Sequence, residues 1–244
     1  MKTISWFSAG VSSAVATKLI IEQIDQIIYT HIEDQHPDTK RFIEDCEAWF
    51  GKSVEITQSL YKTVNNALLG AGGNGYVNGR YGAPCTRLLK RRVRKEWELD
   101  QNCKLRYVWG MDKNEAHRVD RLKAAMPEQE HVFPLIEQGI SKEEAHKILR
   151  ASGIKRPAMY DLGYQNNNCI GCVKGGMGYW NKIRKDFPEA FKSRAEVERR
   201  IGGTCLKDIY LDELDPQAGR KDMPICDDCG IFCELMAITD ELGV

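Results

Sequence analysis

The chain has 244 residues, 42% of them apolar, which is enough for one domain with a smaller appended region. Its 35 basic residues balance its 35 acidic ones, so any phosphate or nucleic-acid site must be local. No apolar run approaches the roughly 20 residues that span a bilayer, and the first residues lack the apolar core of a signal peptide. We therefore expect a cytoplasmic protein with no membrane partner. Nine cysteines are an odd number for a disulfide framework, and in a reducing cytosol the clustered ones indicate metal or redox chemistry.

Short apolar runs alternate with helix-like segments over residues 1–150. The expected helices are residues 11–24 and 38–50, and the expected strands are residues 3–8, 26–32, 52–57, 105–110 and 130–135. Ser141 and Glu144 have the spacing of a capping box, which predicts a helix that ends near Gly153. The alternation predicts an α/β fold with a doubly wound, mostly parallel sheet.

After Ile154 the sequence becomes rich in Gly, Asn and Cys and contains only short helical pieces. We therefore predict a nucleotide-binding domain at residues 1–154 and a cysteine-bearing C-terminal region at residues 155–244. Cys46 and Cys103 are isolated, and a lone cysteine is usually a small buried apolar residue.

The turn after the first expected strand, "FSAGVSSA" at residues 7–14, is rich in small and hydroxyl residues. In an open parallel sheet this turn lies at the carboxyl edge, where the N-terminus of the next helix attracts anions. Gly10 lets the backbone approach a ligand, and the hydroxyls that can donate to phosphate oxygens belong to Ser8, Ser12 and Ser13. A serine-rich helix start is equally compatible with simple helix initiation. The turn is thus a candidate phosphate site that lacks the Walker A pattern.

Basic residues follow the glycine-rich stretch at residues 70–82 and the fourth expected strand. Arg87 and Lys90 lie in a helical run, and Arg118 and Arg121 lie in a later segment. A basic helix surface is commonly just solvated. Because guanidinium groups bind phosphate and sulfate through two donors, these four residues are also candidates to bind a phosphate or sulfate group.

Cys169 and Cys172 form a CxxC pair, whose spacing lets two thiolates from one turn reach the same metal centre. A redox disulfide is the alternative. Cys226 and Cys229 form a second such pair, but the gap of 53 residues is far longer than the roughly 15 to 20 of a zinc ribbon. Zinc therefore stays an alternative to iron, since soft thiolates suit both.

The turn Ser8-Ala9-Gly10-Val11-Ser12-Ser13 resembles the PP-loop of the adenine nucleotide alpha-hydrolase superfamily, commonly SGGxDS. Ala9 stands at the second position and Ser12 where aspartate is usual. Members that cleave ATP generally keep that acid. In lacking the aspartate, the loop resembles that of the phosphoadenylyl sulfate (PAPS) and adenylyl sulfate (APS) reductase branch. That branch binds an adenylylated sulfate.

Further segments resemble that branch in the same order along the chain. "HPDTKRFIEDCEAWF" is similar to the family's FPET segment, "PCTRLLKRR" to its CCxxRK region, and "WGMDKNEAHRVDR" to its GxRxxES…R segment. The stretch from "FPLIEQG" to "CIGC" resembles the part of the family that runs into its CxxC. The resemblance implies a PP-loop fold whose nucleotide and sulfate ligands are Ser8, Gly10, Ser12, Ser13, Arg87, Lys90, Arg118 and Arg121.

The resemblance also implies a four-iron, four-sulfide cluster, which the family holds with a CC pair and the later CxxC. Cys85 falls on the first cysteine of that pair, and Thr86 falls on the second. Three possibilities follow for the fourth position: an open iron, a ligand from elsewhere such as Cys233 or Cys205, or no iron at all. The metal ligands expected on this basis are Cys85, Cys169, Cys172 and Cys233.

The segment Asp228-Cys229-Gly230-Ile231-Phe232 is similar to the tail motif ECG[IL]H of these reductases, with Phe in place of His. The resemblance implies that Cys229 attacks the sulfur of a bound adenylyl sulfate, and that a thioredoxin- or glutaredoxin-like reductant then releases sulfite. Cys226 and Cys233 are additional thiols that could resolve the adduct or bind metal.

Three function classes remain. The first is thiol-dependent reduction of APS or PAPS in sulfur metabolism. The second is ATP-dependent thiolation of a nucleic acid or another acceptor, which is the one class with a nucleic-acid partner. The third is a zinc-bound module without enzymatic activity. A homo-oligomer is compatible with each class.

Overall fold

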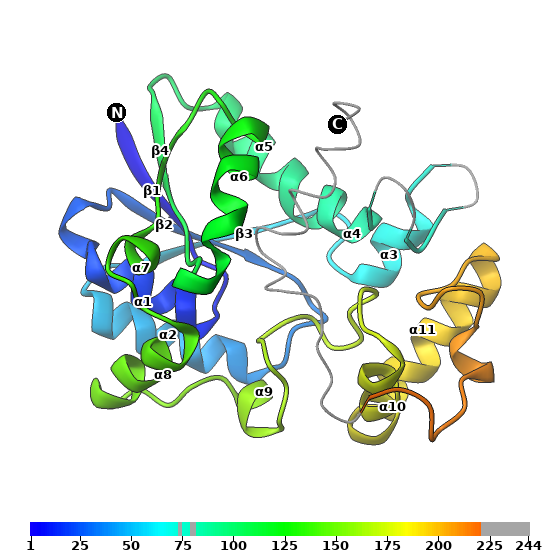
Figure 1. The fold of residues 1–244 in the computed structure, drawn as a ribbon. Helices are drawn as coiled ribbons and strands as arrows, with labels where there is room; N and C mark the ends of the chain where they lie inside the picture. The colour runs from blue at the N-terminus through cyan, green and yellow to red at the C-terminus, as the bar shows by residue number, and fades with distance from the viewer. Residues whose placement is uncertain (73–74, 79–81, 221–244) are drawn as a thin grey trace. The chain divides into compact units, whose positions relative to one another are not determined.

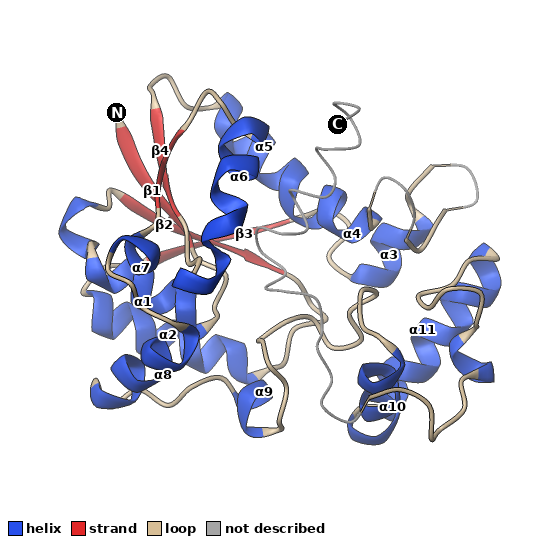
Figure 2. Ribbon diagram, viewed as in Figure 1, coloured by secondary structure: helices blue, strands red, loops and turns tan. Residues whose placement is uncertain are grey.

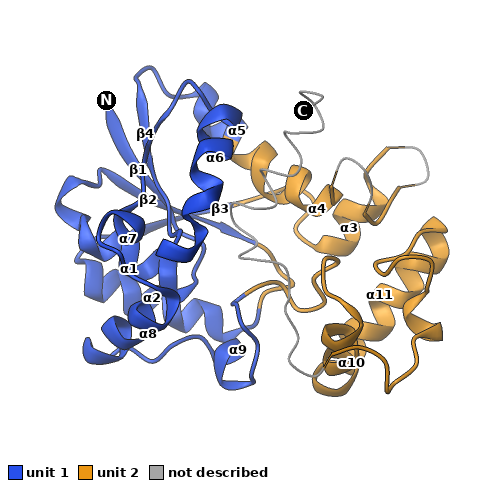
Figure 3. Ribbon diagram, in the orientation of Figure 1, with its two compact units in different colours: residues 1–31, 36–57, 95–167 blue, residues 32–35, 58–94, 168–244 orange. Residues whose placement is uncertain are grey.

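The computed structural model describes residues 1–72, 75–78 and 82–220 of the chain (Figure 1). These residues form two compact units (Figure 3). Unit 1 comprises residues 1–31, 36–57 and 95–167, and the described part of unit 2 comprises residues 32–35, 58–72, 75–78, 82–94 and 168–220. The chain thus passes between the units several times, and residues 58–94 fold with the C-terminal segment.

Unit 1 is built on a five-stranded parallel sheet, which confirms the predicted α/β class (Figure 2). The strands are β1 (Lys2–Trp6), β2 (Gln26–His31), β3 (Val54–Gln58), β4 (Leu105–Val108) and β5 (Glu130–Val132). Their order in the sheet is β3-β2-β1-β4-β5. The order reverses direction at β1, whose neighbours are β2 and β4, so the crevice for a ligand is expected at the carboxyl ends of β1 and β4.

Helices accompany the strands in both units. In unit 1 they are α1 (Val11–Leu19), α2 (Asp38–Phe50), α6 (Val119–Ala125), α7 (Pro134–Glu137), α8 (Lys142–Ala151) and α9 (Ala158–Asp161), with 3-10 turns at Ile21–Gln23 and Lys113–Arg118. In unit 2 they are α3 (Val64–Leu69), α4 (Pro84–Thr86), a π-helical turn (Arg87–Arg91), α10 (Met177–Asp186), α11 (Pro188–Ile201) and a 3-10 turn at Leu211–Glu213, and α5 (Arg92–Leu99) crosses the division.

Most of the predicted boundaries are close to the observed ones. The helix expected at residues 11–24 is wrong in its length, because α1 ends at Leu19 and a 3-10 turn follows. Consecutive β-branched residues, Ile20 and Ile21, lower helix propensity at that point. The capping box is confirmed: Ser141 Oγ accepts from the Glu144 amide at 3.2 Å, and Glu144 Oε2 accepts from the Ser141 amide at 2.7 Å.

The sheet of unit 1 is covered on both faces, as the alternation of side chains along β1 shows. Ser5 points toward α1, where its hydroxyl bonds Thr17 Oγ1 at 2.7 Å. Trp6 points the other way and meets Trp97 of α5 edge-on, with ring centroids 5.6 Å apart. Cys46 is fully buried in the core on the α1 side, as predicted, but Cys103 is exposed because it lies in the polar loop before β4.

The described part of unit 2 has a separate core between α3, α4 and α11. Asp34 bonds to three other segments of this unit, at Val64, Ile170 and Arg194. Its Oδ2 accepts from the Val64 amide at 2.7 Å, its carbonyl accepts from the Ile170 amide at 2.8 Å, and its Oδ1 pairs with Arg194 Nη2 at 3.3 Å. No helix in the described ranges is long and apolar enough to cross a membrane.

Candidate functional site

The turn between β1 and α1 adopts a tight conformation that its own side chains hold. Ala9 has a φ of 56°, in the left-handed region that favours glycine, and it is fully buried. Ser8 Oγ donates to Ser13 Oγ at 2.9 Å, and Ser13 Oγ donates to the Gly10 carbonyl at 3.0 Å. The Ser13 hydroxyl proton therefore holds the turn in this structure, whereas Ser12, also buried, has no such role among the described contacts.

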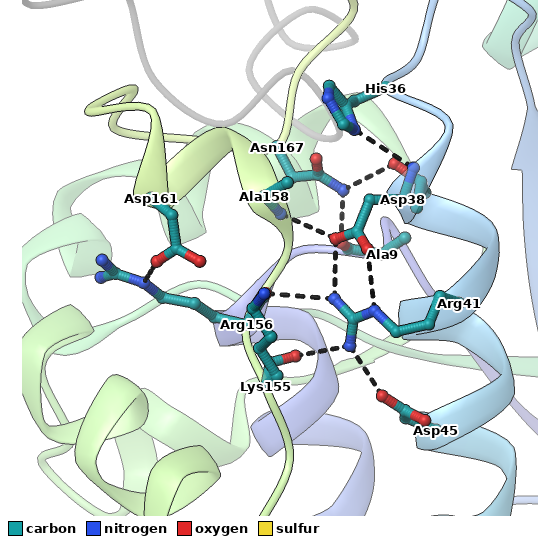
Figure 4. A network of polar contacts seen from close by, with 11 residues as sticks. Ala9, His36, Asp38, Arg41, Asp45, Lys155, Arg156, Ala158, Asp161 and Asn167 are labelled. Carbon is teal, nitrogen blue, oxygen red and sulfur yellow. Dashed lines mark hydrogen bonds and ion pairs between the residues drawn. The ribbon is translucent and has the colours of Figure 1, made fainter.

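Asn167, the last residue of unit 1 in the sequence, also holds this turn. Its Nδ2 donates to the Ala9 carbonyl at 2.9 Å and to Thr39 Oγ1 at 3.2 Å (Figure 4). Tyr160 adds a second contact, because its hydroxyl accepts from the Val11 amide at 3.3 Å. Sequence reasoning missed both residues, and no motif in "QNNNC" or "AMYD" indicates them. Residues about 150 positions away in sequence thus fix the strained Ala9 in place.

Arg41 anchors the chain segment that leads to Asn167. Its guanidinium forms a bidentate pair with Asp38, at 2.8 and 2.7 Å, and pairs with Asp45 at 2.7 Å (Figure 4). It also donates to the carbonyls of Lys155 and Arg156 at 2.8 and 3.2 Å. The hydrogen bonds from Arg41 hold the pKa of Asp38 below its usual value. The N-terminus of α2 is thereby connected to the strap at residues 155–167.

The segment after β4 approaches the N-terminus of α1 closely. A Cβ atom on Gly110 would lie 2.5 Å from Ser13 Cα, so only glycine fits there. Farther along, Arg118 Nη1 bonds Glu115 Oε1 at 2.5 Å and its side chain is 10% exposed, whereas Arg121 is exposed. The close approach places the carboxyl ends of β1 and β4 together, as the strand order predicts for a ligand site.

The CxxC pair and Cys85 belong to unit 2, where they line one narrow, mainly apolar pocket with Thr86 and Lys90. The cavity measures about 10 Å³, close to the space that one water needs. Thr86 is 2% exposed, and its Oγ1 is buried without a hydrogen-bond partner among the described residues. A ligand that bonded this hydroxyl would explain why Thr86 is buried in a pocket lined by cysteines.

The CxxC turn is shaped by backbone contacts. The Cys172 amide donates to the Tyr179 hydroxyl at 2.8 Å, and that hydroxyl donates to the Cys169 carbonyl at 3.3 Å. Gly171 has a φ of 71°, and a Cβ there would lie 3.3 Å from the Trp180 ring. Tyr179 thus bridges the two cysteine positions and fixes their separation within unit 2.

The basic run of unit 2 is not an ordinary α-helix. Arg87–Arg91 form a π-helical turn, in which hydrogen bonds join residues five apart. In an α-helix, residues three and four apart, such as Arg87, Lys90 and Arg91, would share one face, and that geometry does not apply to this turn. Arg87 is exposed, Arg91 is buried, and Lys90 lines the cysteine pocket.

The predicted site residues are therefore distributed over the two units. Cys229 and Cys233, together with Cys226, lie outside the described residues. Unit 1 holds Ser8, Gly10, Ser12, Ser13, Arg118 and Arg121, and unit 2 holds Cys85, Arg87, Lys90, Cys169 and Cys172.

The donor set of the cysteine pocket fits a thiophilic metal centre. Three thiols from two segments line it, and soft thiolates bind zinc and iron–sulfur clusters. Among the residues with a described position, no three His, Cys, Asp or Glu side chains are gathered as they would be around a single bound ion. A metal centre would therefore have to widen the cavity and draw the thiols together as it binds.

Comparison with protein-family models gives no match for this sequence, and the curated proteins include no match either. The PP-loop resemblance accordingly stays a proposal that rests on the motifs of the chain.

Proposed function

We propose that the protein is a sulfonucleotide reductase, which binds APS or PAPS at the β1–α1 turn and transfers its sulfur to Cys229. The observation that carries this proposal is the turn itself. It lies at the carboxyl edge where the strand order reverses, it has a left-handed residue at Ala9, and it carries Ser12 where ATP-cleaving relatives of the PP-loop type carry an acid.

The residues of unit 1 would bind the nucleotide mainly through hydrogen-bond donors around the start of α1. The first amides of α1 have no partner within the helix, and the helix dipole favours an anion at that end. Ser12 can add a hydroxyl donor, and Ser8 can add a second when it releases Ser13 Oγ. Arg118 and Arg121 can add guanidinium donors. The resemblance makes Arg87 and Lys90 further candidates to neutralise the sulfate.

The covalent step would be a displacement at sulfur. The Cys229 thiolate forms a bond to the sulfate sulfur, the bond from that sulfur to the bridging phosphate oxygen breaks, and the nucleotide leaves with its oxygen. A thiolate of a dithiol reductant then attacks the Cys229 sulfur, and sulfite leaves with the electron pair. The second thiol of the reductant closes a disulfide and frees Cys229, so two thiols are oxidised for each sulfate reduced to sulfite.

Cys85, Cys169 and Cys172 would hold the iron–sulfur cluster that the resemblance implies. Such a centre, when bound, supplies soft Lewis-acid and electrostatic chemistry for a sulfur substrate. Lys90 lines the same pocket as the three thiols, and its positive charge would offset the negative charge of a thiolate-bound centre.

Labelled APS, PAPS and ATP offered separately to anaerobically purified protein, with a dithiol reductant, test the proposal. We expect sulfite from one of the sulfate esters and loss of more than about 1,000-fold in rate for Cys229→Ser, because covalent catalysis then has no nucleophile. Cys103→Ser is the matched control and should retain the activity, since Cys103 is an exposed thiol outside every predicted site. Sulfite release that persists in Cys229→Ser would refute the nucleophile.

ATP-dependent thiolation is the second candidate. It is favoured by Thr86, which stands where the resemblance would place the fourth cysteine ligand. Only three thiols line the pocket among the described residues, and a three-thiolate cluster would leave one iron open for sulfur chemistry. Pyrophosphate release from ATP, with no turnover of either sulfate ester, would support this candidate and exclude the reductase. A colourless protein with stoichiometric zinc and neither activity would indicate the zinc-bound module.

A further inference from the structure

Cys205 has no role in the function proposed above, yet it lies in the same unit as the thiols of the cysteine pocket. Cys205 and Cys85 are both half-buried against the apolar cluster that contains Cys169. Burial is the main reason that the pKa of Cys205 is raised, and Cys85 is one of the neighbouring charges that raise it further. The two thiols therefore pack against the same apolar cluster although 120 positions separate them in the sequence.

Arg194 connects Cys205 with the CxxC turn. Its Nη2 would lie 4.0 Å from a Cβ atom on Gly171, the central residue of the turn. The same guanidinium acts on Cys205, where its positive charge opposes the effect of burial on the thiol. The buried Arg194 thus lies beside the CxxC turn and near enough to Cys205 to act on its thiol.

The guanidinium of Arg194 also has hydrogen-bonding capacity to spare. Arg194 is 2% exposed, and its Nε and Nη1 are buried without a partner among the residues of the described ranges. Buried donors beside a metal centre commonly bond the ligand sulfurs and stabilise their negative charge. Thr86 Oγ1, in the lining of the cysteine pocket, is a further buried polar atom of this unit without a described partner.

The loop that carries Cys205 is held from inside unit 2 by Glu198. This carboxylate is fully buried, and it accepts from the Cys205 amide and, at 2.7 Å, from the Leu211 amide. Burial raises the pKa of Glu198 above its usual value, so placing a carboxylate here is costly. Gly202, with a φ of 74°, ends α11 just before the loop. The fold thus fixes the backbone at position 205.

We propose that Cys205 supplies the fourth thiolate of a metal centre whose other ligands are Cys85, Cys169 and Cys172. Cys205 would take the place of the thiolate that is absent at Thr86. A four-thiolate set is the common arrangement for both a four-iron cluster and a structural zinc ion. The inference rests on the metal centre of the proposed function and not on its nucleotide chemistry, so it does not depend on which substrate is bound.

The test uses the full chain loaded anaerobically with zinc in one arm and with ferrous iron and sulfide in the other. Metal and sulfide content show which centre forms. In the zinc arm, X-ray absorption should find four sulfur ligands at about 2.3 Å. Cys205→Ser should lose one sulfur ligand, and its metal affinity should fall by more than the roughly 10- to 100-fold typical of an outer-shell change. The Glu198 contact is to the backbone, so it survives this substitution.

Two variants separate Cys205 from the other thiols. Cys233→Ser and Cys103→Ser should keep four sulfur ligands and the metal content of the wild type. The proposal is overturned if Cys205→Ser keeps four sulfur ligands, or if the wild-type chain holds neither zinc nor iron. Loss of a sulfur ligand in Cys233→Ser would then assign the fourth position to Cys233. Sulfite assays are independent: a chain with four sulfur ligands and no sulfonucleotide turnover would retain this site and refute the reductase.

Discussion

The two units satisfy their buried polar groups in different ways. Around the turn of unit 1, Arg41 donates to two carboxylates and two carbonyls, and Asn167 Nδ2 donates to the turn itself. Around the cysteines of unit 2, Thr86 Oγ1 and two nitrogens of Arg194 have no partner among the described residues. Most polar groups around the turn are thus bonded within the protein, although Asn167 Oδ1 is also buried without a described partner. More of the buried polar atoms near the cysteines lack a partner, so a ligand there would satisfy more hydrogen bonds.

The largest effect is expected from Arg194→Ala, which should weaken unit 2. It leaves Asp34 without its buried partner, and breaking such a pair costs about 3 kcal/mol. Burial already raises the pKa of Asp34, although Arg194 lowers it. Hydrogen exchange in α3 and α11 of the metal-free chain measures the loss, with the exposed Arg200→Ala as the control.

Lowering the pH should reduce the difference in hydrogen-exchange protection between Arg194→Ala and the wild type. At a pH below the pKa of Asp34 its carboxyl is neutral and no longer needs a counter-charge, so the two proteins should converge in protection. A deficit that stays constant down to low pH would mean that lost packing, rather than the ion pair, accounts for it.

An intermediate effect is expected from Arg41→Ala in unit 1. Arg41 is partly exposed, so screening discounts its ion pairs, and loss of its bonds to two carbonyls and Asp38 should cost about 2 kcal/mol. Increased proteolysis or exchange at residues 155–167 is the measurement. Lys40→Ala is the control, because Lys40 is exposed and its partner Glu44 lies 4.0 Å away. It should change the exchange of residues 155–167 little. Equal effects of the two variants would mean that Arg41 does not anchor the strap.

The smallest effect concerns acid and His146, which packs edge-on against Tyr160 with ring centroids 4.8 Å apart. Burial chiefly, with Arg156, Lys142 and Arg150, lowers the pKa of His146 to about 4, while Glu143 opposes them. The unfolded chain therefore takes up a proton before the native one, and stability is lost as the pH falls from about 6.5 to about 4. Because His146 is only half-buried, we expect about 1 kcal/mol.

His146→Phe should remove that part of the pH dependence in unit 1, measured by urea unfolding between pH 4 and 7. His117→Gln is the control, because His117 is exposed. An unchanged pH profile in His146→Phe would contradict the assignment.

Much of the sheet was predictable because its signals are local. The buried strands alternate with amphipathic helices, and α2 spans Asp38–Phe50 as predicted, since Gly51 in the left-handed region ends it. The serines of the turn and the CxxC pair are likewise contiguous in sequence, so spacing alone could mark them as candidate site residues.

The rest depends on contacts between distant residues that carry no pattern. Asn167 bonds Ala9 across 158 positions, and Asn65 of α3 bonds Ser193 of α11 at 2.8 Å across 128. Such pairings bring residues 58–94 into unit 2 with the C-terminal segment. The π-helical turn at Arg87–Arg91 was equally unpredictable, because helical periodicity assumes α-helical geometry.

The most direct test of the reductase proposal is to trap its covalent intermediate. Reduced protein is incubated with sulfur-labelled APS or PAPS without any dithiol, digested and analysed by mass spectrometry. We predict one S-sulfo group on the peptide that contains Cys229, released as sulfite when a dithiol is added. No transfer of label to Cys229, together with pyrophosphate release from ATP, would contradict the proposal.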